Sequence, residues 1–186
     1  YAGTDGKDEA YRIFNSINQK FIDAVRGSGG NNARRHVLIA SYWTSIERAC
    51  DEMFILPDDP ADRMAVSVHY YGPSTLTLIT QDVEWGKART DWGSEADYEE
   101  LNMWFDMMDE HFVKKGIPVI VGEFGCFGSN KTVETCEKWM MDVANAAYSR
   151  KMCPVLWDTP GGEYVRTMCI FKHLDFISSL VGIAQE

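Results

Sequence analysis

The sequence predicts an α/β protein built on a parallel sheet, and three features of the chain lead to this fold class. Four short, largely apolar runs alternate with segments whose apolar residues recur at helical spacing. Runs of this kind are typical of strands that are buried on both faces of a parallel sheet. No linker rich in glycine, proline or serine interrupts the alternation, so we expect residues 1–186 to form a single domain.

The N-terminal part of the chain predicts one helix and two strands. The helix spans about residues 9–25, and the glycines that follow it end it. Residues 37–40 (VLIA) and 65–68 (AVSV) are the first two predicted strands, and residues 42–63 between them carry only a weak helical pattern. The apolar face of the predicted helix consists of Tyr11, Phe14, Ile17, Phe21, Ile22 and Val25.

The C-terminal part predicts two further strands, at residues 118–121 and 154–157, and three helices. The first helix begins near Glu95 and ends at Gly116, and the second is capped by Asn130, Thr132 or both. A weaker helix occupies about residues 174–181. The residues expected to face the core are Leu101, Trp104, Phe105, Met108 and Phe112 in the first helix and Val133, Cys136, Met140, Val143, Ala144 and Ala147 in the second.

Four strands with their flanking helices amount to half of a (β/α)8 TIM barrel. Four parallel strands cannot close into a barrel at tolerable curvature. The open half would leave two sheet edges and one sheet face uncovered, which natural proteins avoid. We therefore expect the half barrel to be completed by a second chain, either a second copy in a homodimer or a complementary half-barrel chain.

The charge of the chain excludes several classes of partner. A net charge of −10 is unsuited to the phosphate backbone of a nucleic acid and to an anionic membrane surface. No apolar run approaches the roughly 20 residues that span a bilayer, so we expect no membrane partner. A neutral polymer or a small neutral ligand is compatible with this charge.

Aromatic and sulfur-containing residues leave two questions open. Six Trp, eight Tyr and nine Phe either form a large core or provide flat surfaces on which sugar rings stack. The five cysteines include no CxxC pair and no histidine at zinc-ligand spacing, so we expect buried thiols or at most one disulfide, and no metal or cofactor.

Chemically versatile side chains stand where three of the predicted strands end. The second strand runs into His69, Tyr70 and Tyr71, the third ends at Glu123, and the fourth is followed by Asp158 after Trp157. In a (β/α) barrel the active site lies at the C-terminal ends of the strands, so these side chains are expected to converge. Taken singly, each is more often a satisfied structural group than a ligand. Their occurrence together favours a site.

Several stretches resemble glycoside hydrolase family 5, the retaining cellulases and related β-glucanases. Residues 15–26 are similar to the fourth barrel helix of that family, and residues 29–35 to the turn into its fifth strand. His69 and Tyr71 match the end of strand six, residues 121–125 (VGEFG) match the nucleophile motif of strand seven, and residues 156–158 (LWD) match the segment after strand eight. The resemblance implies that this chain corresponds to strands 5–8 of the barrel.

The family resemblance also implies a chemistry and a set of roles. Glu123 carries over as the nucleophile of a retaining endo-β-1,4-glucanase that acts on cellulose-type β-glucan, with a hydrogen bond from Tyr71 or Tyr70. His69 is expected near the acid/base and a sugar hydroxyl. A secreted, extracellular location is also implied. Further candidate substrate contacts are Trp157, Tyr70, Asp158, Trp43, Trp85 and Trp92.

One departure from the family limits what the chain is expected to do alone. The family carries its acid/base glutamate in an Asn-Glu-Pro motif after strand four, and this sequence contains no such motif. The chain is either one copy of a self-completing dimer, one half of a two-chain enzyme or a truncated product. Local acids to consider are Glu84, Asp158 and Glu163. The alternative functions are a non-catalytic carbohydrate-binding protein and a purely structural half barrel.

Overall fold

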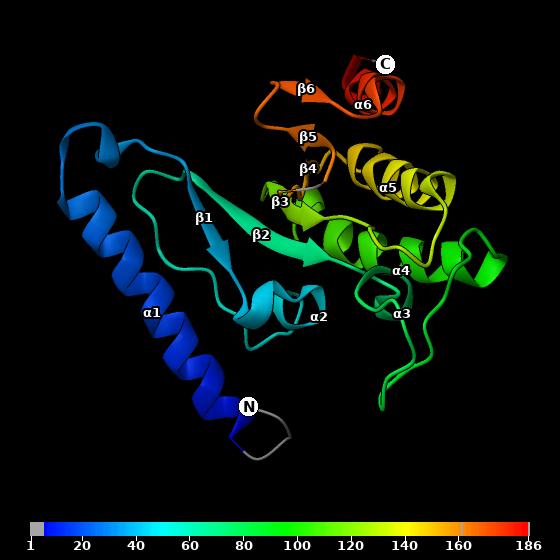
Figure 1. The fold of residues 1–186 in the computed structure, drawn as a ribbon. Coiled ribbons are helices and arrows are strands. Elements are labelled where there is room, and N and C mark those ends of the chain that lie inside the picture. Colours follow the sequence, from blue (N-terminus) through cyan, green and yellow to red (C-terminus); the bar gives the residue numbers. More distant parts are fainter. Residues whose placement is uncertain (1–5, 161, 186) are drawn as a thin grey trace. The chain divides into compact units, whose positions relative to one another are not determined.

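A computed structural model describes residues 6–160 and 162–185, and it contains all of the helices and strands that the sequence predicts. All four predicted strands are present: the first coincides with its prediction, and the ends of the other three are shifted by one to three residues. The predicted elements are α1 (Lys7–Gly27), β1 (Val37–Ala40), β2 (Met64–Tyr70), α4 (Glu95–His111), β3 (Val119–Phe124), α5 (Val133–Tyr148), β4 (Cys153–Leu156) and α6 (Leu174–Gly182) (Figure 1).

The structure adds short elements that the sequence analysis did not predict. They have two to four residues each, too few for apolar periodicity to show. In Figure 1 the hairpin β5–β6, coloured orange, follows β4 and leads to α6. The short elements are η1 (Gly30–Ala33), η2 (Tyr42–Thr44), α2 (Ile46–Ala49), α3 (Ser74–Thr77), η3 (Val113–Lys115), β5 (Tyr164–Val165), β6 (Ile170–Phe171) and η4 (Ile183–Gln185).

The main sheet has the strand order β1-β2-β3-β4, which is the order of the strands in the sequence. β1 and β2 are parallel, with Val37 opposite Met64 and Ala40 opposite Ser67. Parallel neighbours in sequence order need a crossover between each pair, and the intervening helices provide it. The predicted α/β fold with a parallel sheet is therefore confirmed, whereas completion of a barrel by a second chain stays a prediction.

The described residues fall into two compact units. Unit 1 contains residues 6–68 and 107–120, and unit 2 contains residues 69–106, 121–160 and 162–185. β2, β3 and α4 each contribute residues to both units. In unit 1 the amide of Val66 donates to the carbonyl of Pro118, 2.9 Å away, and in unit 2 the amide of Trp157 donates to the carbonyl of Phe124, also at 2.9 Å. The expectation of a single domain stays a prediction.

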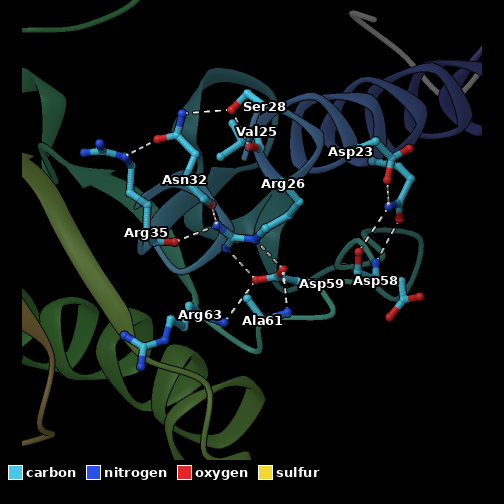
Figure 2. Close-up of polar contacts among 11 residues, drawn as sticks. Asp23, Val25, Arg26, Ser28, Asn32, Arg35, Asp58, Asp59, Ala61 and Arg63 are labelled. Atoms are coloured by element: carbon cyan, nitrogen blue, oxygen red, sulfur yellow. Dashed lines mark hydrogen bonds and ion pairs between the residues drawn. The ribbon is translucent and has the colours of Figure 1, made fainter. Parts of the chain in front are cut away.

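Unit 1 is stabilised by a buried ion pair at the end of α1. The guanidinium of Arg26 donates from Nε and Nη2 to the two carboxylate oxygens of Asp59, at 2.7 and 2.8 Å (Figure 2). The same guanidinium donates to the carbonyls of Asn32 and Arg35. The Asp59 carboxylate also accepts from two backbone amides of its own turn. The pair therefore ties the end of α1 to the segments before β1 and before β2.

This ion pair predicts a specific loss of stability in acid. The hydrogen bond from Arg26 is the main cause that holds the pKa of Asp59 well below its usual range. The unfolded chain binds the proton at the ordinary carboxyl pKa of about 4, so the pair stabilises the fold above that pH. We expect the free energy of unfolding to fall as the pH decreases below about 4, and to fall less steeply in Asp59→Asn. Urea denaturation from neutral pH to about pH 3 measures this, with Asp58→Asn at an exposed neighbour as the control. Equal slopes in Asp59→Asn and the wild type would contradict the prediction.

Unit 2 has its core on the buried face of α5. Thr132 caps the start of the helix, because its hydroxyl accepts from the amide of Thr135 at 3.2 Å, and this confirms one of the two predicted caps. Trp139 on this helix is completely buried, although it was absent from the predicted face, whereas Val133, which was included in it, is exposed. Val133 is the first residue of the helix. The other buried residues of α5 are Cys136, Met140, Val143, Ala144, Ala146 and Ala147.

Candidate functional site

The candidate site lies within unit 2, at the ends of two neighbouring strands. His69 is the second-last residue of β2, Tyr71 follows the end of that strand, and Glu123 is the second-last residue of β3. Successive side chains of a strand point to opposite sides, so His69 and Tyr71 share one side and Tyr70 takes the other. The three residues that the sequence analysis expected to converge at these ends are thus brought together by strand register.

Glu123 receives two contacts on one carboxylate oxygen. The hydroxyl of Tyr71 donates to Oε2 of Glu123 at 3.1 Å, and Nδ1 of His69 lies 3.2 Å from the same oxygen. About a quarter of each of the His69 and Glu123 side chains is exposed, so the carboxylate is accessible while its second oxygen, Oε1, faces neither of these partners. A carboxylate held in this way keeps one oxygen available for a ligand.

The surroundings of Tyr71 keep its phenol protonated, so that it donates a hydrogen bond to Glu123. Burial, followed by its hydrogen bond to the negatively charged Glu123, raises the pKa of the Tyr71 phenol well above its usual range. The phenol therefore stays protonated near neutral pH and donates to the carboxylate. The backbone of Tyr71 is held as well, because the hydroxyl of Thr77 in α3 donates to its carbonyl at 2.5 Å.

Tyr70, which the sequence analysis offered as an alternative partner of Glu123 and as a substrate contact, lies in the core. Its ring stacks on Trp139, with centroids 6.0 Å apart, and meets Phe105 edge to face at 5.2 Å. Only 4% of the residue is exposed, and within the part of the chain described here its hydroxyl has no hydrogen-bond partner. The pKa of Tyr70 is raised because the phenol is desolvated. Tyr71, not Tyr70, faces Glu123.

The two residues that follow β4 have different surroundings: Trp157 is exposed, and Asp158 is hydrogen-bonded to the loop after it. Trp157 is 45% exposed, so its ring is accessible to a ligand. The carboxylate of Asp158 accepts from the amides of Glu163 and Tyr164, at 2.7 and 3.3 Å, and so closes the loop that leads into β5. Both oxygens of Asp158 therefore accept from the backbone of this loop, and its contact with a substrate stays a prediction.

The other candidate acids and tryptophans are distributed over both units. Nδ1 of His173 lies 2.9 Å from Glu163, whose side chain is almost fully buried, so that carboxylate already has a partner. Glu84 and Trp85 are exposed on the segment between α3 and α4. Trp92 donates to Asp142 at 2.8 Å. Trp43 is 75% exposed and belongs to unit 1.

Two residues that support the site were missed by the sequence analysis. Thr77 holds the backbone of Tyr71, as described above, and Nε1 of Trp139 donates to the carbonyl of Gly72 at 2.9 Å. Both contacts fix the chain directly after β2. Thr77 lies in a helix of four residues, which is too short for a periodic pattern of apolar residues to predict it. Gly72 and Trp139 are 67 residues apart, so no local pattern in the sequence indicates their contact.

Among residues 6–160 and 162–185, no cluster of three or more histidine, cysteine or acidic side chains is arranged to hold a metal ion. Over the same residues, no helix combines the length and the apolar character needed to cross a membrane.

Comparisons with known proteins agree on one family. The sequence model of the cellulase family (glycosyl hydrolase family 5) matches residues 2–161. The chain is 36% identical over 153 residues to endoglucanase 1 of Ruminococcus albus and 32% identical over 163 residues to endoglucanase A of Clostridium longisporum. These matches cover 82% and 88% of this chain but only 35% and 30% of the relatives. The chain therefore spans about a third of the length of these relatives.

Solved structures give the same picture. A broad-specificity endoglucanase of family 5 from an uncultured bovine rumen ciliate matches with a TM-score of 0.85 and 30% identity, over 94% of this chain and 54% of that one. A family 5 lichenase from Caldicellulosiruptor sp. F32, in complex with cellotetraose, matches with a TM-score of 0.85 and 26% identity, over 95% of this chain and 50% of that one. About half of each solved chain has no counterpart in these 186 residues.

Proposed function

The chain belongs to the cellulase family, glycosyl hydrolase family 5, and from this premise we propose that it supplies the nucleophile of a retaining endo-β-1,4-glucanase. The observation that supports this best is the carboxylate of Glu123 at the end of β3, held on one oxygen by Tyr71 and His69 and open on the other. The substrate class is β-1,4-glucan, in line with relatives described as endoglucanases. The β-glucan polymer is neutral, which suits a chain with a net charge of −10.

In the proposed reaction Glu123 attacks the anomeric carbon of the sugar. The glycosidic bond breaks as the bond between the Glu123 carboxylate and the sugar forms, and water later releases the sugar from this covalent intermediate. Tyr71 orients the carboxylate through its hydroxyl, and His69 lies on the same oxygen, where it can also reach a sugar hydroxyl. Trp157 offers an exposed indole face for the sugar beside the scissile bond, and Trp43 and Trp85 are proposed as further contacts on exposed segments.

The second carboxylate of the reaction is proposed to come from outside residues 1–186. A retaining glycosidase needs an acid/base carboxyl about 5–5.5 Å from its nucleophile. Asp158 and Glu163 are both engaged in loop contacts, and the chain contains no Asn-Glu-Pro motif. We propose that a complementary half-barrel chain supplies the acid/base and completes the barrel. A second copy of this chain would complete the barrel without bringing that motif, because it has the same 186 residues.

Uncovered apolar surface in unit 1 supports completion by a second half barrel. Ile13, Ile17 and Phe21 recur every four residues along α1, and about half of each is exposed. Leu38 in the middle of β1 is exposed to a similar extent. A stripe at this spacing lies along one face of a helix and is normally buried against another element. The predicted core face of α1 included Ile17 and Phe21, and in the described chain about half of each of these side chains stays exposed.

Unit 2 has a comparable surface beside β4. Val155 in β4 is 44% exposed, and a cavity of about 690 Å³ extends from this strand to the C-terminal helices. Most of its lining is aliphatic or aromatic, with Met152, Leu156 and Leu180 among the residues. Exposed apolar surface of this kind often marks a contact with another protein or a ligand-binding groove.

Covalent trapping tests the proposed nucleophile without a general acid. An activated 2-deoxy-2-fluoro-β-cellobioside with a dinitrophenolate leaving group needs no protonation to react, and the fluorine slows release of the sugar. We expect the chain to gain the mass of one fluorocellobiosyl group on the tryptic peptide that contains Glu123. Absence of label in a folded chain that binds cello-oligosaccharides would favour a carbohydrate-binding protein without catalysis.

Removing the hydroxyl of Tyr71 is expected to slow the trapping reaction. Hydrogen bonds to charged groups contribute about 1.5–3 kcal/mol, so Tyr71→Phe should lower the rate constant of labelling by about 10- to 100-fold. Stopped-flow release of dinitrophenolate measures this rate. Tyr164→Phe, at a tyrosine of the β5–β6 hairpin, is the control and should leave the rate unchanged. An unchanged rate in Tyr71→Phe would mean that the hydroxyl does not act on the nucleophile.

Sedimentation tests the proposed completion of the barrel. A second copy predicts a particle heavier than the 21.1 kDa chain, with a concentration-dependent mass. Ile17→Glu should shift the mass towards the monomer because it places a charge in the apolar stripe of α1, whereas Lys20→Glu, on an exposed position of the same helix, should not. A monomer at all concentrations would exclude the second copy and leave the complementary chain.

Secretion, which the family resemblance implies, remains part of the proposed function.

A further inference from the structure

Two of the five cysteines lie together in unit 2. Cys126 follows β3 by two residues, and Cys136 lies in the first turn of α5. Both line one cavity of about 220 Å³, and both are buried, with exposed fractions of 0% and 9%. Each thiol is the main influence on the pKa of the other. Lys131 lines the same cavity, whereas Cys153 and Cys169 are exposed elsewhere in the unit.

The surroundings give the two thiols different roles. The contact with Cys126 is the main cause that lowers the pKa of Cys136, and the positive charge of Lys131 acts in the same direction. The same contact raises the pKa of Cys126, which therefore keeps its proton and donates it. Because the thiolate is the reactive form of cysteine, Cys136 is the attacking sulfur and Cys126 is the thiol that resolves the product.

We propose that Cys126 and Cys136 are a reversible redox pair, and that a hydroperoxide oxidant joins them in a disulfide that ties the segment after Glu123 to the first turn of α5. The Cys136 thiolate attacks one peroxide oxygen, the O–O bond breaks, and the leaving hydroxide takes a proton to become water. The sulfur of Cys126 then attacks the sulfenic sulfur of Cys136, the S–O bond breaks, and water leaves with the proton of Cys126. The two sulfurs lose two electrons in total, and the peroxide is reduced to water.

A tryptic map under non-reducing conditions tests this directly. Trypsin cleaves after Lys115, Lys131 and Lys138, so the two cysteines fall on the separate peptides 116–131 and 132–138. After treatment of the fully reduced chain with hydrogen peroxide and alkylation of the remaining thiols, we expect these two peptides to be joined, with the loss of two hydrogen atoms. Cys153 and Cys169, on the peptides 152–166 and 167–172, should not be linked to either of them.

Matched variants separate the pair from unspecific oxidation. Cys153→Ser should leave the cross-link intact, and Cys136→Ser should abolish it and leave Cys126 as an alkylated thiol. Dithiothreitol should restore both thiols in the wild type. The proposal is overturned if the wild type yields peptides 116–131 and 132–138 unlinked, with either cysteine alkylated or irreversibly oxidised. It is also overturned if Cys126 or Cys136 is linked to Cys153 or Cys169 instead.

Discussion

Replacing Glu123 with glutamine is expected to lower the rate of the first turnover on an activated aryl β-cellobioside by at least about 10³-fold. This factor lies within the range that a single catalytic group contributes. Glutamine keeps the shape of the side chain and can still accept from Tyr71 and His69. It is, however, a far poorer nucleophile than a carboxylate, so the covalent bond to the sugar would not form. The measurement is the pre-steady-state release of dinitrophenolate, which needs no general acid.

The control for Glu123→Gln is Glu137→Gln. Glu137 lies in α5, its carboxylate is partly exposed, and its nearest ionic partner is His173 at 3.7 Å. The same change of charge and side chain there should leave the first-turnover rate within about twofold of the wild type. A Glu123→Gln variant that releases dinitrophenolate as fast as the wild type would overturn the assignment of the nucleophile, provided that its circular dichroism spectrum is unchanged.

The largest expected loss of stability follows from Trp139→Ala. Trp139 is completely buried in unit 2, stacks on Tyr70, lies 6.4 Å from both Trp92 and Phe124 by ring centroids, and donates to the carbonyl of Gly72. Truncating a buried tryptophan to alanine costs about 3–5 kcal/mol, because contacts are lost and a cavity remains. The lost hydrogen bond would also leave the Gly72 carbonyl without this partner.

Urea denaturation followed by far-ultraviolet circular dichroism measures this loss without relying on tryptophan fluorescence. Trp157→Ala is the matched control, since it removes the same side chain from a position that is 45% exposed and should cost no more than about 1 kcal/mol. Similar free energies of unfolding for the two variants would mean that Trp139 does not form the centre of the unit 2 core.

The strands and long helices were predictable because their signals are local. Residues 37–40 form β1 as expected, and the glutamate after the third apolar run lies near the end of β3. The nearness of His69, Tyr71 and Glu123 also followed from the sequence, because the C-terminal ends of parallel strands lie on one edge of the sheet.

Other parts depend on contacts that no local pattern encodes. The choice between Tyr70 and Tyr71 follows from the direction in which β2 faces, and that direction is fixed by the packing of Tyr70 on Phe105 and Trp139. The position of Asp158 after a strand favours a substrate contact. Its hydrogen bonds to the amides of Glu163 and Tyr164 depend on the conformation of the next six residues, which the sequence pattern does not predict. The hairpin β5–β6 has two residues in each strand, too few for alternation to show.

The apolar stripe of α1 has a consequence for handling the purified chain. At low ionic strength the net charge of −10 makes molecules repel one another, and this repulsion opposes contact between stripes. Salt shortens the range of that repulsion to about 8 Å at physiological ionic strength, while sulfate strengthens the burial of apolar surface. Ile13, Ile17 and Phe21 should therefore make the solubility of the isolated chain fall steeply with added ammonium sulfate. The dependence of solubility on salt would then indicate, independently of catalysis, whether another element covers this face of α1.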